Sequence, residues 1–390
     1  MLSILVKLFI KNSKNYSNAK VRTEYGILCG AFGIFLNIIL FVLKFVFGSI
    51  AASVAMIADG FNNLSDAASS LIQIFGFKLA SKKPDIDHPF GHGRMEYVSG
   101  LIISFLIIVM GFELLKSSLD KIIHPDYSNE QNIFTFIVLA LAIVIKFYMY
   151  FYNHIIAQKI NSVTMEATAK DSLSDTISTF VVIISLIIQQ FVKFPVDGIA
   201  GIIVALFIFK TGIESASDTI KPLLGTTPDE SFVDEIEKEL MRHKPIIGMH
   251  DLVVHDYGPG RVMVSLHAEV PGVMNIFEIH DAIDNAEVDI SKKFDCQVVI
   301  HMDPIDTNNE RLLELKKLVK EECINISPKL NCHDVRMVPG ITHTNLIFDI
   351  VKPFDCMLSD DELTNLLNGN IHKKCPDVFC VITVDQPFIK

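Results

Sequence analysis

Six apolar windows, each long enough to cross a lipid bilayer, fill most of the chain between residues 26 and 215. A helix needs ~20 mostly apolar residues to span a hydrocarbon core ~30 Å thick. The windows therefore predict a polytopic α-helical membrane protein with six transmembrane helices. They are Ile27–Ile50, Ala52–Leu79, Tyr97–Leu115, Ile133–Ile155, Val163–Phe191 and Val196–Ile213.

Charged residues are scarce in these windows and common in the part of the chain after residue 220. This contrast predicts a transmembrane domain over residues 1–220 followed by a soluble tail. The apolar run at the N-terminus is short and lacks a small-residue cleavage site, so we interpret it as an amphipathic lead-in on membrane lipid. The formal net charge of −11 argues against a nucleic-acid partner, since binding phosphates requires a basic face.

Lysine and arginine gather on one side of the predicted helices. Because such residues mark the side that stays in the cytoplasm, both termini and the tail are predicted to be cytoplasmic. The scattered cysteines, without a C-x-x-C pair, suit a reducing compartment better than a disulfide framework. The residues before the first window that carry the charge are Lys7, Lys11, Lys14, Lys20 and Arg22.

The second and fifth windows contain carboxylates and amides. A carboxylate at the bilayer midplane costs ~2.5–3.5 kcal/mol, so such residues are functional candidates. Asp59 with Asn63, and Asp171 with Asp175, are i, i+4 pairs that each place two oxygen donors on one helix face. Two such faces opposed would form a four-ligand cage of hard donors for a divalent cation. The alternative is a structural role, in which the acids pair with nearby lysines.

The loop after the second window contains Asp85, His88 and His92. A carboxylate and two imidazoles this close together could bind a zinc-like metal. The alternative is that the two histidines only form hydrogen bonds within the HPFGHG turn.

Four motifs in this order resemble the cation diffusion facilitator family of divalent-metal/proton antiporters: ADGFNNLSD, DIDHPFGHGRME, the D-x-x-x-D of the fifth window and VVIHMDP. The resemblance covers about residues 20 to 305. It implies a homodimer in the cytoplasmic membrane of a bacterium. This homodimer would export metal from the cytosol through a transport site between the second and fifth helices. The ligands it implies are Asp59, Asn63, Asp171 and Asp175.

Donor chemistry favours Mn²⁺ as the exported cation. Imidazole suits zinc, and the zinc carriers of the family have a histidine where this chain has Asp171, whereas an all-oxygen set suits octahedral Mn²⁺. Export of Zn²⁺, or of Fe²⁺, Co²⁺ or Cd²⁺, is the alternative. Crowded carboxylates also repel one another until a cation or protons neutralise them, so metal and protons should compete for one site.

From Asp229 the tail has an α-β-β-α-β pattern that resembles the ferredoxin-like metal-binding domain of the family, over residues 221–305. Strand alternation places His301 and Asp303 on one face. Divalent metal would then be a regulatory ligand as well as the substrate. The tail ligands implied are His250, His267, His280, His301 and Asp303.

Residues 306–390 repeat this pattern, which predicts an internal duplication of the tail domain. Asp385 lies 82 positions after Asp303 and His333 lies 83 after His250. The second copy is either a weak hard-cation site or, as we prefer, a packing and dimerisation module.

Two other function classes compete with a transporter. A membrane metalloenzyme is not expected, because the polar membrane residues form no Ser-His or H-E-x-x-H arrangement. A metal sensor whose tail moves on binding cation would use the same tail ligands, and metal-stimulated proton flux in vesicles would separate it from a transporter.

Overall fold

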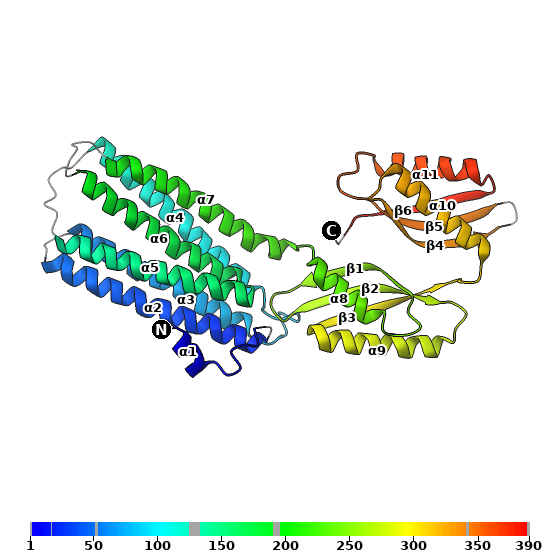
Figure 1. Cartoon of the computed structure of the whole chain (residues 1–390), viewed down its shortest axis with the longest axis horizontal. Helices are drawn as coiled ribbons and strands as arrows, with labels where there is room; N and C mark the ends of the chain where they lie inside the picture. The colour runs from blue at the N-terminus through cyan, green and yellow to red at the C-terminus, as the bar shows by residue number, and fades with distance from the viewer. Residues whose placement is uncertain are drawn as a thin grey trace. The chain divides into compact units, whose positions relative to one another are not determined.

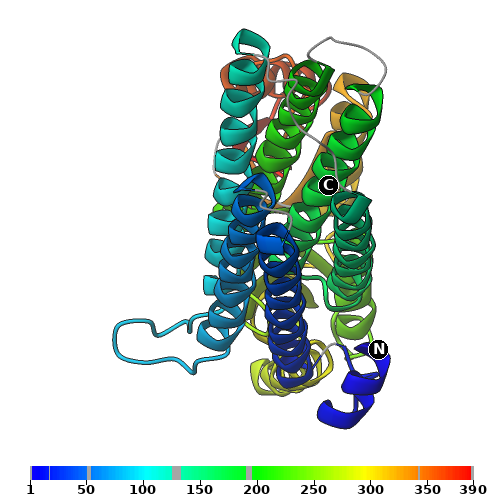
Figure 2. The same ribbon diagram turned by 90° about the vertical axis from the view of Figure 1, so that its left-hand side faces the viewer.

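The computed structural model describes residues 2–16, 18–50, 54–124, 133–189, 196–340 and 343–387. The chain divides into two compact units, each drawn in Figures 1 and 2. We call residues 1–226 with 256–261 the membrane unit, and residues 227–255 with 262–390 the tail unit.

The membrane unit is a bundle of long helices preceded by the short helix α1 (Leu2–Phe9). Each long helix overlaps one apolar window, although the predicted start at Ala52 and the predicted end at Phe191 lie outside the described residues. Helix α2 packs against α3, α4 against α7, and α5 against α6. The bounds are α2 (Ala19–Ile50), α3 (Val54–Ala80), α4 (Met95–Ile123), α5 (Ile133–Ile160), α6 (Val163–Gln189) and α7 (Val196–Leu224).

Four helices in the described part of the chain are long and apolar enough to cross a membrane by length and composition: α2, α4, α5 and the Gly198–Leu224 part of α7. Helices α3 and α6 contain the polar residues of the second and fifth windows. Several helices extend beyond their windows, as α7 does by continuing from Ile213 to Leu224. The windows end with the apolar run, whereas the backbone hydrogen bonds of the helix continue into the polar residues that follow.

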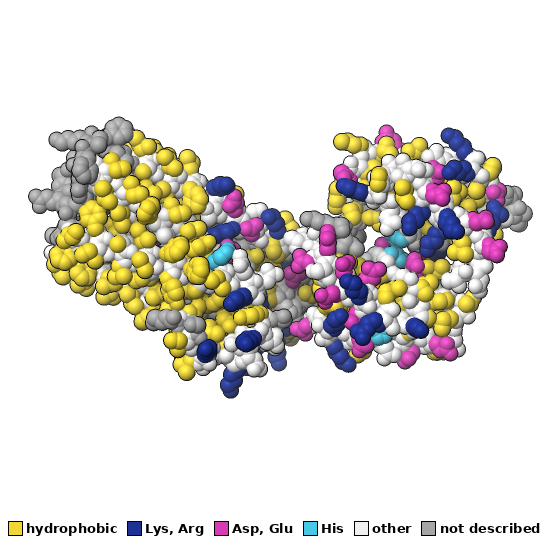
Figure 3. Space-filling model, in the orientation of Figure 1, with side chains coloured by type: hydrophobic (Ala, Val, Ile, Leu, Met, Phe, Trp, Pro, Cys, Tyr) yellow, Lys and Arg dark blue, Asp and Glu magenta, His cyan; other side chains and the backbone are white. Residues whose placement is uncertain are grey.

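The bundle has an apolar exterior, and its interior buries polar as well as apolar side chains. Phe35, Phe105 and Val109 are at least half exposed, and the surface of the helices in Figure 3 is dominated by hydrophobic side chains. Asn37 and Gln73 are buried between helices. This distribution is the one expected in lipid, where polar side chains face the bundle interior.

The tail unit begins with a three-stranded sheet in the order β1-β2-β3, with β2 parallel to β3. Its core includes Leu252, Leu266 and Ile290, which are fully buried or nearly so. The predicted α-β-β-α-β order is confirmed. The elements are α8 (Glu230–Leu240), β1 (Gly248–Asp256), β2 (Val262–Pro271), α9 (Ile276–Phe294) and β3 (Cys296–Ile305).

A second sheet, in the order β4-β5-β6, has the same succession of elements and its own core around Leu346, Phe348 and Leu363. Strand β5 is antiparallel to β4 and parallel to β6. We call residues 230–305 the first tail subdomain and 310–385 the second. The elements of the second are α10 (Glu310–Ile326), β4 (Asn331–Pro339), β5 (Thr344–Val351), α11 (Asp360–Lys374) and β6 (Val378–Asp385).

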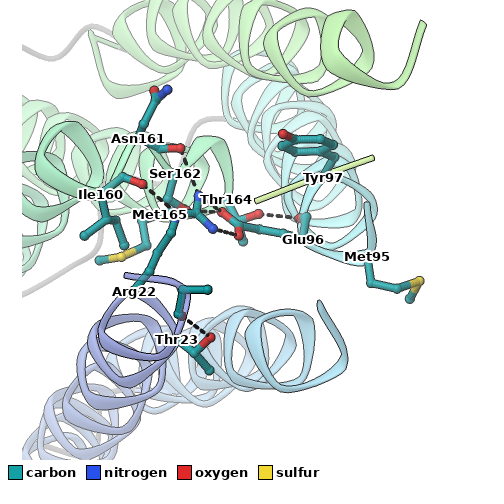
Figure 4. Close-up of polar contacts among 12 residues, drawn as sticks. Arg22, Thr23, Met95, Glu96, Tyr97, Ile160, Asn161, Ser162, Thr164 and Met165 are labelled. Carbon is teal, nitrogen blue, oxygen red and sulfur yellow. Dashed lines mark hydrogen bonds and ion pairs between the residues drawn. The ribbon is translucent and has the colours of Figure 1, made fainter. Parts of the chain in front are cut away.

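One buried ion pair connects three parts of the membrane unit (Figure 4). Arg22 on α2 contacts Glu96 on α4 through two nitrogens, and the Nη2–Oε1 distance is 2.8 Å. Ser162 donates to the same carboxylate at 2.6 Å, and Arg22 Nε donates to the carbonyl of Ile160 at 2.7 Å. Because the side chain of Glu96 is fully buried, its charge depends on these donors for compensation.

We expect Arg22→Met to lower the free energy of unfolding by about 3–5 kcal/mol, because it leaves a buried carboxylate without its cation. The double variant Arg22→Met/Glu96→Met should recover part of the loss. Unfolding in detergent micelles measures both, with Lys20→Met, an exposed position on the same helix, as the control. Equal stability of Arg22→Met and wild type would contradict a structural role for the pair.

Candidate metal sites

Three carboxylates from two helices meet around one lysine inside the bundle. Asp66 on α3 and Asp171 and Asp175 on α6 each offer an oxygen within 4.8 Å of the others. Nζ of Lys146, on α5, donates to Oδ2 of Asp66 at 2.7 Å and to Oδ2 of Asp175 at 2.6 Å. The side chains of Lys146 and Asp66 are nearly inaccessible. We call these four residues the bundle cluster, and its oxygens are hard donors suited to a divalent cation.

The structure brings most of the predicted transport ligands to this cluster. Asp171 and Asp175 are members, and Nδ2 of Asn63 donates to Oδ2 of Asp66 at 3.2 Å. Asp59 is not a member of the group whose ligand atoms lie within 4.8 Å of one another. Its Oδ2 is 2.8 Å from Nζ of Lys44, and its side chain is 39% exposed. The acid that α3 contributes to the cluster is thus Asp66.

Residue spacing alone does not select Asp66, because α3 contains two overlapping i, i+4 pairs. Asp59 with Asn63 is one, and Asn62 with Asp66 is the other, offset by three residues. Spacing shows that each pair shares a helix face but not which face meets α6. In the structure the side chain of Asn62 is exposed, whereas those of Asn63 and Asp66 are buried.

Two buried oxygens of this region remain available to a ligand. Oδ1 of Asn63 and Oδ1 of Asp171 accept no hydrogen bond from any residue that the structure describes. A buried acceptor without a donor is costly. A bound cation or an ordered water would satisfy both atoms.

The three predicted loop residues also come together. Asp85, His88 and His92 each offer a ligand atom within 4.8 Å of the others, and the two imidazole rings lie 4.6 Å apart. Asp85 accepts hydrogen bonds from Lys82 Nζ at 2.6 Å and from the backbone N–H of His88 at 2.9 Å. These donors, first the Lys82 side chain, hold the pKa of Asp85 well below its ordinary value. The carboxylate is therefore charged and partly committed to a neighbouring cation.

In the first tail subdomain, His250, His267 and Asp303 form a further group with ligand atoms within 4.8 Å. Nδ1 of His267 is 2.9 Å from Oδ2 of Asp303, and Nε2 of His250 is 3.0 Å from the same oxygen. Both nitrogens of the buried His250 ring lack a hydrogen bond to the described residues. Two imidazoles and a carboxylate can hold zinc or another divalent metal with one position open.

Of the other two tail candidates, one joins this group and one does not. His301 pairs with His267 across β2 and β3, with rings 4.7 Å apart, and its Nε2 lies 3.3 Å from Oδ1 of Asp303. This contact confirms that His301 and Asp303 share a face. His280, on α9, is exposed and its Nδ1 lies 3.3 Å from Oδ2 of Asp284 on its own helix.

A bundle of apolar helices that buries hard oxygen donors, followed by an α/β tail with His and Asp clusters, is the architecture of a membrane transporter for metal cations. Comparison with protein families agrees: residues 31–224 match the cation efflux transmembrane domain, and residues 228–305 match the cytoplasmic domain of cation efflux proteins. The chain is an integral membrane protein and belongs to the cation diffusion facilitator family. Both matches end before the second tail subdomain.

Individual relatives cover the same share of the chain. An uncharacterized transporter of Methanocaldococcus jannaschii is 35% identical over 275 residues, 69% of this chain and 95% of the relative. The manganese efflux system protein MneS of Bacillus subtilis is 28% identical over 272 residues, 69% of this chain and 92% of its own length. The cation-efflux pump FieF of Shewanella oneidensis is 25% identical over 267 residues, 68% of this chain and 90% of its own length.

The charge balance of the bundle cluster predicts how a substitution of Lys146 changes the stability of the protein. Lys146→Met should lower the free energy of unfolding by about 3–5 kcal/mol in metal-free detergent solution, because it leaves buried carboxylates without their cation. Added Mn²⁺ should then raise the melting temperature of Lys146→Met more than that of wild type. Lys44→Met is the matched control, since its ion-pair partner Asp59 is not one of the three grouped acids and is 39% exposed. Equal changes in stability and in melting temperature for the two variants would contradict the proposal that Lys146 compensates the buried carboxylates.

Proposed function

We propose that this protein exports Mn²⁺ from the cytosol in exchange for protons, by alternating access to the bundle cluster. Family membership supports transport of a divalent cation. The observation that carries the proposal is the meeting of Asp66, Asp171 and Asp175 inside the bundle.

Charge explains how one cluster can serve both ions. With its three carboxylates ionised and Lys146 charged, the cluster carries two net negative charges. One divalent cation or two protons would neutralise this charge, so binding of the metal and binding of the protons exclude each other. If the inward-facing state prefers metal and the outward-facing state prefers protons, a proton gradient drives metal export.

The donor set favours manganese. The bundle cluster offers only carboxylate oxygens, with the amide of Asn63 beside them, and hard oxygen donors suit Mn²⁺. Two relatives are named manganese efflux system proteins, MneS and MneP of Bacillus subtilis. Zn²⁺ is the second candidate, because the tail groups contain imidazoles.

For the arrangement in the membrane, we propose six spans, with α3 and α6 crossing inside the bundle and both termini in the cytoplasm. The match of residues 228–305 to a cytoplasmic domain supports the position of the tail. We further propose a homodimer in the cytoplasmic membrane of a bacterium, regulated by metal at the loop and tail groups. On this view, residues 306–390 are a duplicate of the first tail subdomain.

The transport site is tested by a matched pair of variants on α3. Asp66→Asn should reduce Mn²⁺ uptake into inverted vesicles to background, because it removes a charged ligand that α3 supplies. Asp59→Asn should keep most of the uptake, since Asp59 pairs with Lys44 outside the cluster. The reverse result, with Asp59→Asn inactive and Asp66→Asn active, would place the transport site at Asp59 instead of Asp66.

Selectivity is tested on α6. Asp171→His replaces a hard oxygen by an imidazole, so the ratio of Zn²⁺ to Mn²⁺ uptake should rise. Only a partial switch is expected, because the other oxygens remain. Competition between the two metals in vesicles measures the ratio, with Asp171→Asn as the control for loss of charge alone. An unchanged ratio would show that residues outside the cluster determine the choice of metal.

A further inference from the structure

A second group of metal-ligand side chains lies where the two tail subdomains meet. Asp251 belongs to β1 of the first subdomain, while His333 on β4 and Asp385 at the end of β6 belong to the second. Each offers one ligand atom, and these atoms all lie within 4.8 Å of one another. Nε2 of His333 is 3.0 Å from Oδ1 of Asp251 and 3.9 Å from Oδ2 of Asp385.

The imidazole of His333 is positioned as a ligand rather than as a hydrogen-bond donor. Its side chain is only 8% exposed. Its buried Nε2 makes no hydrogen bond with any described residue, although the Asp251 oxygen is close. Two ligand atoms on a metal ion with bonds of about 2.0–2.2 Å lie about 3.0–3.5 Å apart. The His333–Asp251 separation fits a shared ion, and the nitrogen lacks the partner that such an ion would supply.

The backbone of β1 directs two consecutive side chains to this region. Successive residues of a regular strand point to opposite faces. Asp251 has a positive φ of 51°, which breaks this alternation. His250 therefore contacts Asp303 while Asp251 reaches His333, and the rings of His250 and His333 lie 5.0 Å apart.

Strand β4 also has an aspartate with a positive φ directly after a histidine, but this aspartate has a different partner. Asp334 follows His333 as Asp251 follows His250, and its φ is 50°. Asp334 is paired with Arg336 at 2.8 Å. Within the described residues, neither Asp251 nor Asp385 has an ion pair with lysine or arginine. Their charge therefore remains available for a cation.

Asp251 also connects this group to the neighbouring one. Its Oδ1 faces His333, whereas its Oδ2 lies 3.9 Å from Nδ1 of His267. A carboxylate with one oxygen toward each of two ligand sets is the arrangement that bridges two metal ions about 3.5–4 Å apart.

We propose that Asp251, His333 and Asp385 form a second divalent-metal site of the tail, which joins the two subdomains and shares Asp251 with the group formed by His250, His267 and Asp303. The mixed imidazole and carboxylate donors suit Zn²⁺, Mn²⁺, Fe²⁺ or Co²⁺. Because the ligands come from both subdomains, bound metal stabilises their association. This proposed site does not depend on transport, so it is tested separately from the proposed export.

The test is the number of ions bound by the full-length protein in detergent, measured by equilibrium dialysis against Mn²⁺ and again against Zn²⁺. His333→Gln and Asp385→Asn should each bind one ion fewer per chain than wild type. The matched control is His372→Gln on α11, whose Nδ1 is 3.3 Å from the carbonyl of Val378 and which lies outside the group; it should bind as many ions as wild type. Asp385→Asn changes little volume at a partly exposed side chain, so it keeps the test valid if His333→Gln does not fold.

Electron paramagnetic resonance of the Mn²⁺-loaded protein tests the bridge. Wild type should show a spin-coupled pair, and His333→Gln and Asp251→Asn should each abolish the coupling while His372→Gln retains it. Unchanged ion counts in both His333→Gln and Asp385→Asn would overturn the site. A full count with uncoupled Mn²⁺ in wild type would overturn the bridging role of Asp251.

Discussion

The buried carboxylates around Lys146 are the constraint on which the rest of the membrane unit depends. Three acids inside an apolar bundle are tolerated only when charge and hydrogen bonds compensate them. Lys146 supplies one positive charge to two of the acids. Because the exterior of the bundle is apolar, these charged groups lie between the helices. A divalent cation would balance the negative charge that Lys146 leaves uncompensated. Transport and structure therefore share one electrostatic requirement.

Much of the fold could be predicted from the sequence because apolar periodicity reflects burial directly. The six windows coincide with six long helices in the described residues, and the succession of helices and strands in both tail subdomains matches the predicted order. Six crossings are a proposal, since α3 and α6 are not among the helices that qualify by length and composition within the described residues. Their polarity is explained by the bundle cluster.

The site could be predicted only in part, because residue spacing does not determine which helix face meets which neighbour. Spacing predicts Asp171 and Asp175, which the structure brings together with Asp66, whereas Asp59, the predicted ligand on α3, pairs with Lys44. In the tail, matching offsets indicated that His333 and Asp385 correspond to His250 and Asp303. Their contact with Asp251 depends on how the two subdomains pack against each other, and a local sequence pattern does not predict that packing.

The most direct test of this account is to locate manganese in the protein itself. Crystals of the full chain grown with Mn²⁺ would give an anomalous difference map at the manganese absorption edge. The account predicts a peak among the oxygens of Asp66, Asp171 and Asp175, with Nζ of Lys146 moved away from the ion. A peak beside Asp59, or metal at the tail and loop groups alone with Lys146 still bound to Asp66, would contradict it.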